Sequence, residues 1–194
     1  MEISAQAAVI DIFFLILCLR ILYISVSRGI VCEVLKIIGL LAGALFAFQY
    51  YSSIAATASN KIPFFRKEHL EGVVFFLILL VIGIVFHFVQ LIVTFLFKRE
   101  QIPRGERWLS FFLGGTRVSF SLSVIIFLLS LFSFTPQDIY RTISYGLFKN
   151  IAPKVYLVSF GFYNKINPKA VLNKEVEAYY ETEKSLSGDS KKGY

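Results

Sequence analysis

The sequence predicts an all-α polytopic membrane protein, with a bundle of four transmembrane helices followed by a C-terminal interfacial amphipathic helix. The first observation is composition, because 56% of the 194 residues are hydrophobic and only 17% are charged. Soluble domains are about 45–50% apolar and about 25% charged. The second observation is that the apolar residues form four runs long enough to cross a hydrocarbon core of about 30 Å. The third is that Lys and Arg mostly flank these runs, as is typical of membrane proteins.

The transmembrane domain is predicted over residues 1–136, with helices at about 7–26, 31–50, 72–97 and 108–134. Each run should be helical because irregular backbone cannot face lipid, and strands are not expected. The first run is expected to stay in the mature protein, since no basic residue precedes it and Asp11 lies within it. The link between the first two runs is very short and contains Gly29, so these helices should form a tight antiparallel hairpin.

Residues 137–166 carry apolar side chains mostly at intervals of four, with Arg141, Lys149 and Lys154 between them and an interruption near Pro153. Beside a membrane domain, this basic amphipathic pattern predicts a helix that lies in the membrane interface. The alternative is a helix packed against the loops of the same protein. Residues 167–194 are polar and are predicted to be a largely disordered tail.

The distribution of charge predicts the location and excludes several classes of function. Arg28 in the first link and four basic residues in the third link favour a cytoplasmic position for both links and periplasmic termini, although basic residues in the second link and the tail favour the reverse. The net charge is +7, but the Lys and Arg residues that produce it mostly flank apolar runs, so no nucleic-acid partner is expected. No zinc-binding or nucleophilic motif occurs, so we expect no enzyme activity, cofactor or metal site.

Four basic residues lie inside the predicted helices, where charge is costly and often marks function. Arg20 and Lys36 lie about 12 Å from the first link, and His87 and Arg117 about 15 Å from the third, so Arg20, Lys36, His87 and Arg117 are predicted to form one cationic layer. In one interpretation, Arg20 and Lys36 extend to the headgroups. In the other, Arg117 builds an anion or lipid-phosphate site, because Gly114 and Gly115 let a helix or a headgroup approach.

Other polar and small residues predict packing. Asp11 lies near the opposite end of the first helix and cannot pair with Arg20 within it. Glu33 lies beside Arg28, so we expect an ion pair or a cap on the second helix, which is a structural role. Gly39 and Gly43 place small residues four positions apart and favour helix association, with the choice of partner helix left open.

Several short motifs occur in a characteristic order within this four-helix frame. They are Asp11, Arg28-Gly29, Glu33, Gly39, Gly43, Arg107-Trp108-Leu109-Ser110 and Gly114-Gly115-Thr116-Arg117-Val118. In this order the chain resembles the colicin V production protein (CvpA) family over roughly residues 7–165. It departs from the family pattern at Val31-Cys32, Ser110 and Val118. The resemblance implies a bacterial inner-membrane protein needed for production or export of the toxin colicin V, without a cofactor.

Two functional hypotheses follow. The first is a membrane scaffold or accessory factor in toxin export or envelope maintenance. The second is a small oligomeric channel, transporter or lipid-binding protein that uses the cationic layer around Arg117. The expected partners are the lipid bilayer, anionic lipid headgroups, and further copies of the chain or other membrane proteins.

Overall fold

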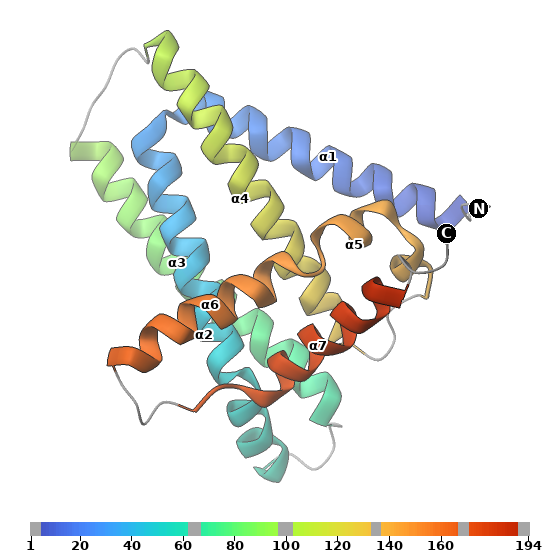
Figure 1. Ribbon diagram of the computed structural model, residues 1–194. Helices are drawn as coiled ribbons and strands as arrows, with labels where there is room; N and C mark the ends of the chain where they lie inside the picture. The colour runs from blue at the N-terminus through green and yellow to red at the C-terminus, as the bar shows by residue number, and fades with distance from the viewer. Residues whose placement is uncertain (1–4, 62–66, 97–102, 133–136, 167–170, 190–194) are drawn as a thin grey trace.

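The computed structural model describes residues 5–61, 67–96, 103–132, 137–166 and 171–189 (Figure 1). Within these ranges every regular element is a helix, which confirms the all-α prediction. The elements are α1 (Ala5–Arg28), α2 (Ile30–Lys61), α3 (Lys67–Leu96), α4 (Arg104–Ser130), the 3₁₀ helix η1 (Gln137–Arg141), α5 (Ile143–Phe148), α6 (Ile151–Ile166) and α7 (Lys174–Asp189).

The first four helices are each long and apolar enough to cross a membrane, as the sequence predicts. Their apolar spans are Ala7–Ser27, Ile30–Ser59, His69–Leu96 and Gly105–Ser130. The second helix differs most from its prediction, because α2 has 32 residues and continues to Lys61. At 1.5 Å per residue it is about 48 Å long, so it exceeds the hydrocarbon core by several turns. The fourth helix ends at Ser130, before the predicted end at residue 134, and residues 133–134 lie outside the described part of the chain.

The helices do not pair in chain order. Helix α1 packs along α4 and α2 packs along α3, whereas α1 and α2 diverge from the link at Gly29 (Figure 1). Gly29 has a φ of 78°, a left-handed conformation that glycine adopts without steric cost. The predicted role of Gly29 in the turn is therefore confirmed, but the predicted tight hairpin is wrong. Close contacts between helices occur at glycines, but they join α2 to α3 and α4 to α1 and do not join α1 to α2.

Two glycines set those close approaches. A Cβ atom on Gly39 of α2 would lie 2.7 Å from the Cβ of Phe86 on α3, and one on Gly114 of α4 would lie 2.5 Å from the Oγ of Ser25 on α1. Either distance is too short for a side chain, so both contacts require glycine. A Cβ atom added at Gly43 would be in ordinary contact with Ile82, and one added at Gly115 would meet no atom within 4 Å.

An aromatic core joins the membrane helices to the C-terminal segment. The rings of Phe48 and Phe127 are 4.7 Å apart and those of Phe48 and Phe75 are 5.3 Å apart, both edge to face. Tyr156 of α6 lies 5.5 Å from Phe48, and Tyr179 of α7 lies 5.0 Å from Phe127. Such pairs stabilise packing beyond the area that they bury. The C-terminal helices are thus part of the folded core.

The C-terminal segment differs from its prediction in two ways. Residues 137–166 form three short helices instead of one, and α6 lies against α2 and α4, with Ala152 and Tyr156 buried. The backbone N–H of Ala152 donates to Ser123 Oγ at 2.7 Å. Residues 167–194 were predicted to be a largely disordered tail, but residues 174–189 form α7, in which Val176 and Tyr179 share a face that packs into the aromatic core. The remainder of the predicted disordered tail, residues 167–173 and 190–194, includes stretches outside the described residues.

Candidate functional site

A carboxylate is fully buried where three membrane helices meet. Glu33, in the first turn of α2, is 0% exposed. Its Oε1 lies 2.8 Å from Arg117 Nη1 of α4 and accepts from the Ser25 hydroxyl of α1 at 2.9 Å, while its Oε2 accepts from Lys36 Nζ at 3.2 Å. We call Ser25, Glu33, Lys36 and Arg117 the charge cluster.

Local features of the sequence bring these four residues together. Lys36 follows Glu33 by three positions, so both side chains lie on one face of α2. Gly114 lies one helical turn before Arg117, and its missing side chain admits Ser25. Arg117 Nη2 also lies 3.4 Å from the Ile21 carbonyl oxygen and from Ser25 Oγ, so the guanidinium connects α4 to α1 as well as to α2.

The electrostatics of the charge cluster bear on the predicted cationic layer and on the predicted role of Glu33. The side chains of Lys36 and Arg117 are only 17% and 11% exposed, and a buried charge is tolerated when it is paired and hydrogen-bonded. The predicted cationic layer therefore contains a carboxylate, which leaves Glu33, Lys36 and Arg117 with a formal sum of +1. Glu33 was expected to pair with Arg28 or to cap α2; it lies in the first turn of α2, and among the described side chains it pairs with Arg117 and Lys36. The Arg28 side chain lies outside the described part of the structure.

The other two members of the predicted layer take different positions. His87 is exposed on α3 and lines a cavity together with Lys36. Arg20 is exposed on α1 and does not line that cavity. The structure thus joins Arg117 to Lys36 through Glu33, joins Lys36 to His87 through the cavity, and leaves Arg20 apart.

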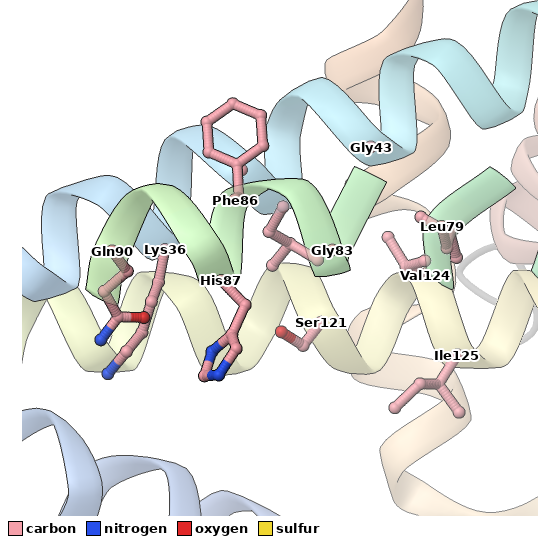
Figure 2. A pocket seen from close by; sticks show the side chains of 12 residues that line it. Lys36, Gly43, Leu79, Gly83, Phe86, His87, Gln90, Ser121, Val124 and Ile125 are labelled. Atoms are coloured by element: carbon pink, nitrogen blue, oxygen red, sulfur yellow. The ribbon is translucent and has the colours of Figure 1, made fainter. Parts of the chain in front are cut away.

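The cavity has a volume of about 480 Å³ and lies between α2, α3 and α4 (Figure 2). Lys36, His87 and Gln90 are at one end of it, while Leu79 and Val124 are at the other. Residues of all three helices line the cavity, and α3 and α4 contact each other sparsely beside it. This volume is within the range of pockets that hold small molecules.

Asp11 makes a second polar connection, at the other end of α1. Its Oδ2 accepts from the backbone N–H of Ile143 at 3.1 Å, and its Oδ1 accepts from the N–H and the hydroxyl of Ser144 at 3.0 and 2.6 Å. Thr142 Oγ1 accepts from the N–H of Tyr145 at 3.1 Å. Since the first N–H groups of a helix have no partner within it, Asp11 and Thr142 together cap α5. Asp11 thereby ties α1 to the C-terminal segment.

Sequence reasoning missed three polar residues of this framework: Ser25, Ser144 and Glu106. Glu106 Oε1 accepts from the backbone N–H of Ile30 at 3.2 Å and so caps α2. Serine and glutamate within or beside apolar runs have no diagnostic spacing. The one available signal was that a polar group in a membrane helix needs a partner.

Several motif residues therefore shape the turn, the cap and the contacts between helices. Gly29 makes the turn, Asp11 caps α5, Glu33 pairs with Arg117, and Gly39 and Gly114 admit neighbouring helices. Among the described residues, no group of three or more His, Cys, Asp or Glu side chains is placed to hold a metal ion.

Comparison with known proteins identifies a family. A family model described as colicin V production protein matches residues 10–153, a segment that extends from α1 to the start of α6. It includes the charge cluster, the cavity and the Asp11 contact with α5. No curated protein sequence and no solved structure matches the chain.

Proposed function

The chain belongs to the colicin V production protein family, and we propose that it acts as a membrane scaffold or accessory factor for production or export of that toxin. It is a multi-pass membrane protein with four helices able to span the bilayer. The proposed location is the bacterial inner membrane, with periplasmic termini and a further role in envelope maintenance. The proposed role involves no catalysis.

The pairing of Glu33 with Arg117 carries this proposal. An anion-transport site would present the guanidinium to a passing ion, whereas here Glu33 Oε1 lies 2.8 Å from Arg117 Nη1 and is itself fully buried. Charge-assisted hydrogen bonds of this kind are strong and orient both partners. The motif residues Glu33 and Arg117 thus hold α2 and α4 together, and Ser25 connects them to α1. A rigid bundle of this kind suits a platform for other membrane proteins.

We propose that one face of the C-terminal segment, formed by α5 and α6, lies at the membrane interface. Exposed apolar side chains of α5 and α6 lie beside basic residues, a combination that favours the boundary between acyl chains and anionic headgroups. These side chains are Ile143, Leu147, Val158 and Phe162, with Lys149, Lys154 and Lys165 near them. The opposite face packs on the bundle, so we propose that this segment both caps the bundle and rests on the membrane surface. Further copies of the chain or other membrane proteins are the proposed partners of the exposed helix faces.

Two measurements test the scaffold against a channel or transporter. In cells that carry the toxin genes, wild-type protein should restore toxin export to a deletion strain and should cross-link to other membrane proteins. In liposomes, the purified protein should conduct no ions, and Arg117→Ala and Arg20→Ala should give the same flux as wild type. Ion flux that Arg117→Ala abolishes while the fold stays intact would replace the scaffold with a channel.

A further inference from the structure

The cavity between α2, α3 and α4 is polar at one end and apolar at the other. Lys36, His87 and Gln90 provide ammonium, imidazole and amide groups at the polar end. The opposite end is lined by Gly43, Leu79, Val124 and Ile125 (Figure 2). A ligand that fills this space therefore has a polar head and a hydrocarbon part.

The depth of the two ends matches the orientation of a membrane lipid. Lys36 lies six residues after Ile30, the first residue of α2, which corresponds to about 9 Å along the helix. Gly43 lies seven residues further along, so the apolar end is about 10 Å deeper in the membrane. A lipid whose headgroup lies at the membrane surface near the α1–α2 link would place its acyl chain in the same direction.

The charge of the polar end selects the kind of headgroup. The charge cluster adjoins the cavity through Lys36, and its Glu33, Lys36 and Arg117 carry a formal sum of +1. His87 adds an imidazole, which offers at least one N–H donor in either protonation state. Together these groups favour an anion at the polar end.

The cavity is also accessible from the bilayer. His87 is exposed on α3, and a Cβ atom added at Gly83 would meet no atom within 4 Å. Helices α3 and α4 contact each other sparsely, and both are long and apolar enough to span the bilayer, so we expect a lipid to enter between them. The surrounding bilayer supplies a ligand of the required chemistry at high local concentration.

We propose that this cavity binds an anionic phospholipid from the leaflet at the α1–α2 link. The phosphate lies at the end formed by Lys36, His87 and Gln90, and one acyl chain lies against Leu79 and Val124. This site is distinct from the predicted phosphate site at Arg117, because Arg117 does not line the cavity, whereas Lys36 lines it while its Nζ also pairs with Glu33. The inference goes beyond the proposed scaffolding role and does not depend on it.

Lipid binding to the purified full-length protein in detergent tests the proposal. Native mass spectrometry would give apparent dissociation constants for phosphatidylglycerol and for zwitterionic phosphatidylcholine with the same acyl chains. We expect phosphatidylglycerol to bind at least about tenfold more tightly, and Lys36→Gln to weaken it by about tenfold. Inorganic phosphate should not displace the lipid, because it has no hydrocarbon part.

A second pair of variants keeps the test independent of any effect of Lys36 on folding. Gly83→Leu places a side chain in the open space of the cavity and should reduce phosphatidylglycerol binding by about tenfold. The matched controls are Gly115→Leu, which also enters open space but does not line the cavity, and Arg20→Gln, which removes an exposed cation elsewhere. Equal binding of the two lipids, full binding by Gly83→Leu, or displacement by inorganic phosphate would each overturn the proposal.

Discussion

Glu33 of α2 and Arg117 of α4 form an ion pair in which Glu33 Oε1 and Arg117 Nη1 are 2.8 Å apart. Removing two charges from water is costly, and the cost is recovered only when geometry and additional hydrogen bonds are good. Here Ser25 and Lys36 complete the coordination of the carboxylate. The pair therefore defines how α1, α2 and α4 meet, and its loss should affect the whole bundle.

Replacing Glu33 should be severely destabilising. Glu33→Gln keeps the size of the side chain but leaves the guanidinium of Arg117 and the ammonium of Lys36 without their buried counter-charge. Breaking a buried pair from one side costs about 3–5 kcal/mol. Unfolding in detergent, followed by circular dichroism, would measure the loss. Arg20→Gln, at an exposed cation, should change stability by no more than about 0.5 kcal/mol, and an equal effect of the two substitutions would contradict the assigned role of Glu33.

The double variant of Glu33 and Arg117 should lose less stability than the sum of the losses in the two single variants. When Glu33→Gln is combined with Arg117→Gln, both charges of this pair are removed and only Lys36 loses its counter-charge, so the free energies of unfolding should not add. We expect a coupling energy between about 0.5 and 3 kcal/mol, within the range for residues in direct contact. Strict additivity would mean that the two side chains act independently.

The two glycines at positions 39 and 83 should respond in opposite ways to alanine. In Gly39→Ala the new Cβ would lie 2.7 Å from Phe86 Cβ, so α2 and α3 must separate, at a cost of about 1–3 kcal/mol. In Gly83→Ala the Cβ enters open space, and the higher helix propensity of alanine should stabilise α3 by up to about 1 kcal/mol. Thermal unfolding of both variants compares them directly, and a loss of similar size at the two positions would argue against a close approach at Gly39.

Removing the Asp11 carboxylate should loosen the C-terminal segment without disrupting the bundle. Asp11→Ala deletes the acceptor for the N–H groups of Ile143 and Ser144, and loss of a cap costs about 0.5–2 kcal/mol. Hydrogen exchange at these two amides should accelerate while exchange in α2 and α3 stays the same. Asp11→Asn, which keeps one acceptor oxygen, should show a smaller increase. Unchanged exchange at Ile143 and Ser144 in Asp11→Ala would exclude the capping role.

Stability at alkaline pH should depend on Tyr156. Its hydroxyl is buried, donates to Gln49 Oε1 at 2.6 Å and accepts from the N–H of Asn173 at 3.2 Å. Burial raises the pKa of Tyr156 above its usual value of about 10, so the folded state holds the proton more tightly than the unfolded state. The resulting stabilisation is complete below about pH 10 and is lost as the pH rises through the raised pKa.

The matching variant is Tyr156→Phe. It should be less stable than wild type at neutral pH, because both hydrogen bonds of the hydroxyl are lost. Above about pH 10 the difference in free energy of unfolding between the two proteins should shrink. A difference that is constant from pH 8 to pH 11 would show that the Tyr156 hydroxyl is not linked to folding.

Much of the packing could not be read from the sequence because it depends on residues distant in the chain. The spacing of Gly39 and Gly43 indicates a close helix contact but does not indicate α3 as the partner. Glu33 was expected to pair locally with Arg28, since neighbours in sequence are the only pairs that spacing alone can judge. The helix at 174–189 was missed because a narrow apolar strip of Val176 and Tyr179 matters only once an aromatic core exists to receive it.

The sequence by itself determined the number of membrane helices, their positions except for the extension of α2 to Lys61, and the turn at Gly29. These are local properties, because every segment of backbone in lipid must satisfy its own hydrogen bonds and every left-handed turn favours glycine. Only the tertiary structure decided which helices touch, which acid accompanies Arg117 and where a cavity remains. Lipid solvates all apolar helix faces about equally, so shape complementarity at Gly39 and Gly114 and the directions of a few buried polar side chains select one arrangement.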